Sequence, residues 1–163
     1  MVARRAQLEA HNARLRLTVP VVSRCEFTNI YHCAVRKTAS QWVKEELPKG
    51  FSPQKRRDME DELEEIRQEI EMARFLVWRA AWMADKRIPN SKEASMSKAY
   101  AGGLVMKATS TAVRITAPGE DSEYKRFIHK WFRDAKVFDI FEGTAQVQRL
   151  VIARRMFPGI DIP

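Results

Sequence analysis

The sequence has 163 residues, of which 45% are hydrophobic, and a net charge of +8. This length predicts one compact domain whose core needs no staples, and no apolar run approaches the length of a membrane span. The two cysteines, Cys25 and Cys33, belong to no CxxC motif or Cys/His cluster, which argues against a zinc site or a disulfide framework and favours a reducing compartment.

The positive charge is spread over several segments. Residues 1–57 contain 12 basic and 4 acidic residues (+8), residues 58–85 contain 3 and 9 (−6), and residues 86–163 contain 14 and 8 (+6). No recognisable RNA- or DNA-binding motif accompanies this charge, so we expect no nucleic-acid partner. A basic surface would suit an anionic cofactor or the phosphates of coenzyme A, or would simply keep the domain soluble.

Residues 1–28 are predicted to form a basic N-terminal extension. The segment is rich in arginine and contains few acidic residues, and Pro20 interrupts it. It weakly resembles an organellar targeting peptide but lacks the usual serines. A short solvated helix or a disordered lead-in is the alternative, and we favour it.

The bundle is predicted to begin at about Asn29. A first helix runs from there until Pro48 and Gly50 stop it. The residues that mark this helix are Asn29, Ile30, Cys33, Ala34, Lys37 and Trp42.

The clearest helix begins at Ser52 and Pro53, an N-cap followed by a first-turn proline. Apolar residues then recur at alternating steps of four and three, which predicts a seam facing a partner helix. The seam consists of Met59, Leu63, Ile66, Ile70, Ala73, Val77, Ala80 and Ala84. A second apolar strip, Met72, Phe75 and Trp82, predicts that the second half of the helix is buried on two sides, whereas residues 58–65 stay in solvent.

Two features of this helix have alternative interpretations. The aromatic residues Phe75, Trp78 and Trp82 are expected to be core residues, although they could also line a cofactor. The acidic run from Glu60 to Glu65 is expected to be a solvated face because it lacks metal-ligand geometry.

A third helix is predicted to begin with a capping box formed by Asn90 and Glu93. Its interior is rich in small residues, and the adjacent Gly102 and Gly103 suggest that a neighbouring helix, or else a ligand, lies against them. The segment Ala117–Gly119 ends this helix.

An aromatic amphipathic segment follows the third helix and includes His129. This histidine has no second His or Cys at metal spacing, so it is expected to be a packing or surface residue. The aromatic and aliphatic residues of the segment are Tyr124, Phe127, Ile128, Trp131 and Phe132. No strand-like alternation occurs, so the fold class is predicted as an all-α, antiparallel up-down bundle of four to five helices.

The last helix is preceded by an apolar run that ends in Glu142. Gly143 and Thr144 then open the helix, with Thr144 as its N-cap. An apolar stripe of Val147, Leu150, Val151 and Met156 is predicted along it, with Gln146, Gln148 and the arginines elsewhere. Glu142 could act as a base if it is desolvated, or it could belong to an ordinary capped surface turn.

The segment IFEGTAQVQRLVIAR, with RDAK just upstream, resembles the end of the acyl-CoA dehydrogenase family. The likeness extends back through EIEMARFLVWRAAWMAD (residues 69–85) and KEASMSKAYAG (residues 92–102), which resemble two long helices of that family's C-terminal helical domain. Residues 29–157 are therefore expected to form such a bundle, with residues 158–163 as a tail. The family's N-terminal helical domain and middle β-domain have no counterpart in these residues.

The resemblance implies a role for the glutamate. In the resembled enzymes, the glutamate of the EGT sequence removes the pro-R proton α to an acyl-CoA thioester, while the β-hydrogen leaves as hydride to N5 of the flavin of FAD. By position, Glu142 would be this base, Gly143 would leave room for the thioester, and Thr144 and Gln146 would contact FAD. Arg114 stands where the family approaches the dinucleotide, and it is a further candidate for cofactor binding.

Two turns differ from the family pattern. After Arg114 the family carries a GGxG turn, whereas this chain reads Ile115 to Gly119 with Pro118 in place of a glycine. The first helical hairpin lacks the family's arginine and Phe-Gly pair and reads Pro-Lys-Gly-Phe-Ser at residues 48–52.

Two hypotheses follow from the resemblance. The first is an acyl-CoA dehydrogenase-like oxidoreductase domain or subunit of fatty acid metabolism, inactive alone, which needs the missing domains from elsewhere. Its expected partners are acyl-CoA, FAD, further copies or a separate chain in an oligomer, and an electron-transfer flavoprotein, in the bacterial cytoplasm or the mitochondrial matrix. The second is a non-catalytic assembly subunit that keeps the bundle and its oligomerisation surface.

Overall fold

The computed structural model describes residues 28, 31–47 and 50–159. The predictions for residues 1–27, Pro48 and Lys49 lie outside this part of the chain, as do those for Asn29, Ile30 and residues 160–163. A helix covers residues 31–45, and four further helices follow it. These are α2 (Pro53–Asp85), α3 (Ser91–Thr116), α4 (Glu123–Ile140) and α5 (Ala145–Met156).

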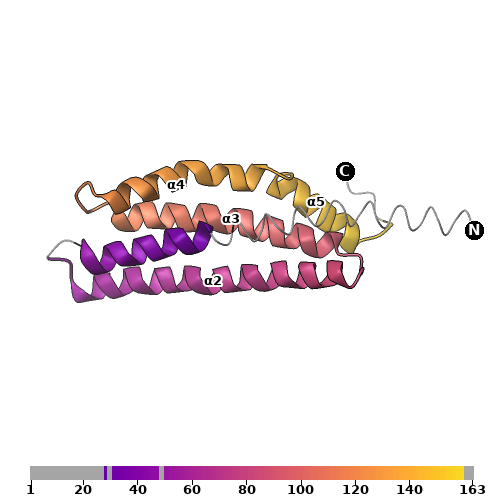
Figure 1. Cartoon of the computed structure of the whole chain (residues 1–163), viewed down its shortest axis with the longest axis horizontal. Coiled ribbons are helices and arrows are strands. Elements are labelled where there is room, and N and C mark those ends of the chain that lie inside the picture. The colour runs from indigo at the N-terminus through magenta and orange to yellow at the C-terminus, as the bar shows by residue number, and fades with distance from the viewer. Residues whose placement is uncertain (1–27, 29–30, 48–49, 160–163) are drawn as a thin grey trace, which may run out of the picture.

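The helices pack side by side as a bundle, and α4 and α5 follow each other along one side of α3 (Figure 1). The helix over residues 31–45 contacts α4 directly, because the Tyr31 hydroxyl donates to the Trp131 carbonyl at 2.9 Å. α3 packs against α2, α4 and α5. The described residues contain no strand, and the prediction of an all-α antiparallel bundle is confirmed.

α2 begins as predicted. The Ser52 hydroxyl accepts a hydrogen bond from the Lys55 amide at 3.2 Å, and Pro53 occupies the first turn, where its missing N–H does not matter. Six members of the predicted seam are buried, and they turn toward the rest of the bundle: Leu63, Ile66, Ile70, Ala73, Val77 and Ala80.

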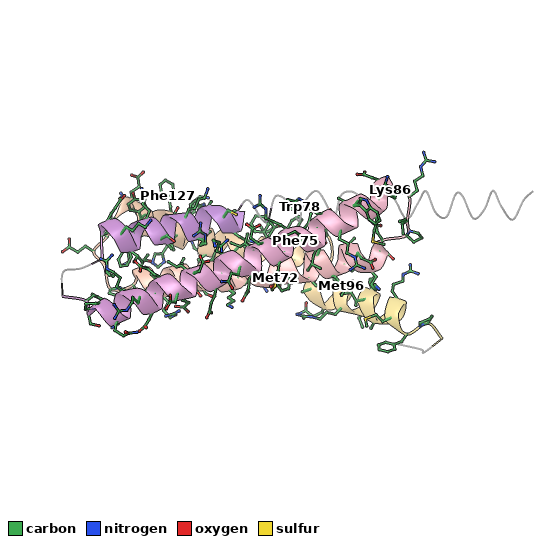
Figure 2. All side chains as sticks on the ribbon, turned by 90° about the horizontal axis from the view of Figure 1, so that it is seen from below. Met72, Phe75, Trp78, Lys86, Met96 and Phe127 are labelled. Atoms are coloured by element: carbon green, nitrogen blue, oxygen red, sulfur yellow. The ribbon has the colours of Figure 1, made fainter. Side chains whose placement is uncertain are left out.

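The second apolar strip of α2 is not buried, so that prediction is wrong for this chain. Met72, Phe75 and Trp82 are 54%, 63% and 56% exposed, and Trp78 is 51% exposed. At 3.6 residues per turn these side chains lie on the face of α2 opposite the buried seam, where no described element covers them. Figure 2 views this side of α2 and labels Met72, Phe75 and Trp78 along it.

The predicted capping box at the start of α3 is also wrong. Asn90 is the N-cap residue, but its side chain makes no capping bond. Its Nδ2 instead donates to the Ala80 carbonyl at 2.7 Å, and Glu93 lies 3.4 Å from the ammonium of Lys92. Because Asn90 is buried, its amide must find a partner inside the protein, and the last turns of α2 provide one.

The largest core cluster joins the helix over residues 31–45 to α2, α3 and α4. Its fully buried centre is Trp42, and a β-carbon added to Gly119 would lie 2.4 Å from the Trp42 ring. Gly119 is therefore required where the chain crosses this ring. The buried members of the cluster are Val35, Ala39, Trp42, Val43, Leu63, Ala112, Ile115 and Ile128.

The two adjacent glycines of α3 differ in their surroundings. A β-carbon on Gly102 would lie 3.2 Å from the Phe138 carbonyl oxygen, so the predicted close helix contact is confirmed there. A β-carbon on Gly103 would have no atom within 4 Å. Only the first glycine is needed for the packing of α3 against α4.

Candidate functional site

The candidate site is the corner formed by residues 141–144, which joins α4 to α5. The Phe141 amide donates to the Val137 carbonyl at 3.0 Å and ends α4. Thr144 begins α5, because its hydroxyl accepts a hydrogen bond from the Val147 amide at 3.3 Å. The prediction of Thr144 as an N-cap is confirmed, and Glu142 and Gly143 form the centre of the corner.

The backbone at the centre of this corner is left-handed. Glu142 has a φ of 61° and Gly143 a φ of 89°. A non-glycine residue in this conformation costs on the order of 1–3 kcal/mol, and such residues cluster at functional sites. Sequence patterns do not reveal this strain, because a glutamate is an ordinary residue for a helix end but an uncommon one for a left-handed position.

Two buried side chains from different helices bond to the backbone around Glu142. Gln148 of α5 is 7% exposed, and its Nε2 donates to the Glu142 carbonyl at 2.8 Å. Lys98 of α3 is 4% exposed, and its ammonium donates to the Asp139 carbonyl at 2.8 Å, in the last turn of α4. A buried ammonium is unfavourable unless it is bonded, so these contacts fix Lys98 as well as the corner.

The sequence reasoning missed both of these residues. It placed Gln148 outside the apolar stripe of α5, whereas the structure buries Ala145 and Gln148 and leaves Val147, Leu150 and Met156 exposed. Val151, the fourth residue of the predicted stripe, is half-buried, so three of its four residues do not face the bundle. Gln148 lies on the inward face of α5 and bonds to the corner from there. Ala145, Gln148 and Ile152 recur at steps of three and four, and this spacing was the signal in the sequence.

The corner brings together four of the five predicted site residues. Glu142, Gly143 and Thr144 are consecutive, and Gln146 is exposed on the first turn of α5. Arg114 lies near the opposite end of α3, roughly 24 Å along the helix axis from Lys98. Its guanidinium forms an ion pair with Glu62 of α2.

An open groove runs beside the middle of α3. It has a volume of about 470 Å³, and Gly103 lies in its wall together with side chains of α2, α3 and α5. The ion pair of Lys107 with Glu69, at 2.5 Å, borders it. The apolar side chains in its wall are Leu76, Met96, Leu104 and Ile152.

The described residues contain no group of His, Cys, Asp or Glu side chains that could hold a metal ion. None of the helices in the described part of the chain is both long enough and apolar enough to cross a membrane.

Comparison with known proteins identifies a family for the whole bundle and curated relatives of part of it. The family model "Acyl-CoA dehydrogenase, C-terminal domain" matches residues 28–157. A probable acyl-CoA dehydrogenase of Bacillus subtilis, YngJ, is 39% identical over 95 residues, which are 58% of this chain and 24% of the relative. A cyclohexane-1-carbonyl-CoA dehydrogenase of Geobacter metallireducens is 43% identical over 88 residues, which are 53% of this chain and 23% of the relative.

Solved structures share the fold. An electron transferring flavoprotein structure from Acidaminococcus fermentans superposes with a TM-score of 0.76 and 27% identity, covering 87% of this chain and 37% of that chain. A glutaryl-coenzyme A dehydrogenase in complex with glutaryl-CoA gives a TM-score of 0.74 and 23% identity, covering 88% of this chain and 36% of that chain.

The matched stretch spans about a quarter of the length of these curated relatives. The family match covers the described bundle from Thr28 to Phe157, including the corner at Glu142. The chain therefore belongs to the acyl-CoA dehydrogenase family, of which it carries the C-terminal helical domain.

Proposed function

We propose that this bundle contributes the catalytic base and part of the FAD-binding surface of an acyl-CoA dehydrogenase-like oxidoreductase. The observation that supports the proposal most directly is the left-handed backbone of Glu142, which buried side chains of α3 and α5 hold in place. The N-terminal helical domain and the β-domain of such an enzyme would come from elsewhere in the same protein or from a separate chain.

The proposed chemistry explains the need for a fixed carboxylate. A proton on the carbon α to a thioester is only weakly acidic, so the base must lie within hydrogen-bond reach of it and be correctly aligned. The Glu142 carboxylate would take this proton, and Gly143 would leave space beside it for the thioester. A corner anchored at Asp139 and at Glu142 fixes the direction from which the carboxylate approaches.

The polar groups at the start of α5 fit part of an FAD molecule. The Thr144 hydroxyl, the exposed Gln146 amide and the first-turn N–H groups of α5 provide hydrogen-bonding groups next to Glu142. When bound, FAD supplies the acceptor for the β-hydrogen and its two electrons. Arg114 stays a prediction as a cofactor ligand, because it would first have to leave Glu62.

The experiment is a search for flavin in the purified chain, alone and mixed with candidate partner chains that carry the missing domains. The proposal expects a flavin absorption band and acyl-CoA oxidation in at least one combination. Glu142→Gln should then abolish turnover while the far-UV circular dichroism stays unchanged. Colourless preparations in every combination, or full turnover by Glu142→Gln, would overturn the proposal.

We also propose, for the alternative role as an assembly subunit, that α2 pairs with α2 of a second copy. The supporting observation is the exposed aromatic face of α2, since a helix that is apolar on both faces is normally buried on both. Glu64 and Glu71 precede Phe75 on this face, where each pairs with an arginine three residues later (Arg67 and Arg74), and Arg79 and Lys86 follow it. In an antiparallel pair centred on Phe75, Glu71 would face Arg79 of the partner and Glu64 would face Lys86.

Sedimentation at increasing protein concentration tests this pairing. We expect a dimer that Phe75→Glu dissociates. Glu71→Arg and Arg79→Glu should each weaken the dimer, and the double variant should restore it, because the charges are exchanged across a two-fold axis. A chain that stays monomeric at all concentrations, or a double variant weaker than both single variants, would refute the arrangement.

Other partners and the compartment follow from the proposed oxidoreductase role. An acyl-CoA thioester is the proposed substrate, and an electron-transfer flavoprotein is the proposed recipient of the electrons. The proposed setting is fatty acid metabolism in the bacterial cytoplasm or the mitochondrial matrix.

A further inference from the structure

We propose that Gln148 is a positioning residue for Glu142: its side-chain amide holds the backbone of the base in the left-handed conformation that aims the carboxylate. The inference rests on the proposed role of Glu142 as the base. It assigns a task to a buried side chain of α5 that lies outside the EGT sequence itself.

The geometry of the amide supports this assignment. Nε2 of Gln148 donates to the Glu142 carbonyl at 2.8 Å. The same nitrogen would lie 3.0 Å from a β-carbon added to Gly143. The amide is thus placed against both left-handed residues of the corner, and Gly143 provides the space that it occupies.

A side chain that only stabilised the start of α5 would make a different bond. The amino end of a helix lacks partners for its first N–H groups, and Thr144 supplies one by accepting from the Val147 amide. Gln148 instead donates to a carbonyl outside the helix, six residues earlier in the chain. Its bond satisfies no helix-end amide, and it acts on the residue that carries the carboxylate.

Lys98 fixes the other side of the same corner. Its ammonium donates to the Asp139 carbonyl in the last turn of α4, and it lies 5.9 Å from the centre of the Phe141 ring. The chain is therefore fixed on both sides of residues 140–141, from α3 at Asp139 and from α5 at Glu142. Of these two bonds, the Gln148 bond is the one that acts on the backbone of Glu142 itself.

The test compares Gln148→Met and Gln148→Leu, two variants of similar size that cannot donate this bond, in the full 163-residue chain. NMR reports the backbone conformation of Glu142 through its amide-to-Hα coupling and its carbon chemical shifts. We expect both variants to lose the left-handed signature at Glu142 and to speed amide exchange at Val147 by roughly 2- to 10-fold. Gln68→Met is the control, because Gln68 is an exposed glutamine of α2, and it should change neither quantity.

A measurement on the unmodified chain covers the case in which the variants do not fold. A scalar coupling across the hydrogen bond should connect Nε2 of Gln148 to the carbonyl carbon of Glu142, and the Nε2 protons should exchange slowly. Absence of this coupling, together with fast exchange, would overturn the inference. An unchanged left-handed signature in both folded variants would overturn it as well.

Kinetics separate this inference from the proposed function. In any assembly that oxidises an acyl-CoA thioester, Gln148→Met should lower kcat by roughly 10- to 100-fold, because a misaligned base loses reaction geometry, while KM stays within about twofold. If no assembly shows flavin or turnover, the proposed function fails whatever the NMR result. If turnover is found and Gln148→Met keeps the full kcat, the positioning role fails and Glu142 keeps its own.

Discussion

Replacing Glu142 by glycine should make the domain more stable than replacing it by alanine. Alanine keeps the β-carbon that makes a left-handed backbone unfavourable, whereas glycine removes it. Both substitutions delete the same carboxylate, so the difference between them isolates the backbone term. At most other positions of a helical protein the alanine variant is the more stable of the two. The sign of the stability difference at Glu142 is therefore informative.

The expected magnitude follows from two opposing terms. A left-handed conformation costs an L-residue about 1–2 kcal/mol relative to glycine. Glycine loses more chain entropy on folding, which offsets roughly 0.5–1 kcal/mol of this gain. Glu142→Gly should therefore be more stable than Glu142→Ala by roughly 0.5–1 kcal/mol, which at typical urea m-values raises the denaturation midpoint by about 0.5 M.

The assay is urea unfolding followed by far-UV circular dichroism, with two matched positions. Arg87, after α2, has a φ of 57°, and there too the glycine variant should be more stable than the alanine variant. Glu60 is exposed in the interior of α2, and there glycine should be less stable than alanine by about 1 kcal/mol. The refuting result is an alanine variant that is more stable than the glycine variant at Glu142, as expected at Glu60, while Arg87 shows the opposite. Glu142 would then not be held in a left-handed conformation.

Further predictions concern the core. Gly119→Ala should lower stability by about 1–3 kcal/mol in urea unfolding, because its β-carbon would lie 2.4 Å from the Trp42 ring, whereas Gly103→Ala, where space is open, should raise it by about 0.5–1 kcal/mol; equal effects would contradict the packing. Burial lowers the pKa of His32 from 6.5 to about 4, although its bond to the Ala101 carbonyl partly opposes this shift. As the pH falls, the unfolded chain therefore binds a proton at His32 before the folded chain does. The stability that comes from burying neutral His32 is present above pH 6.5 and is lost between about pH 6.5 and 4. Roughly 2 kcal/mol should be lost between pH 7 and 5, and His32→Gln, which should fold because its amide can donate to Ala101, should remove most of that slope; an unchanged slope in this variant would show that other groups cause it.

The helices could be predicted from the sequence because their start and stop signals are local. Ser52 with Pro53 begins α2, and Thr144 begins α5, in each case through a bond within the same turn. The seam of α2 was also predictable, since a repeat of three and four residues has one structural meaning. These features need no knowledge of the neighbouring helices.

Features that depend on a distant partner were not predictable. Asn90 had the pattern of a capping residue, but burial directed its amide to Ala80, ten residues earlier. Gln148 looked like a surface residue in the sequence, but its side chain is buried and donates to the Glu142 carbonyl. In both cases a buried polar side chain bonds to a carbonyl that the linear pattern does not reveal.

The position of α5 has a consequence for how the domain opens. α5 packs mainly against α3, and it is the shortest of the labelled helices, with 12 residues. It can therefore detach while α2, α3 and α4 stay assembled, so its amides should exchange with solvent through small openings of low free energy. A neighbouring chain that covers the outward side chains of Val147 and Leu150 would suppress these openings, and it would thereby order the residues next to Glu142 without touching the carboxylate.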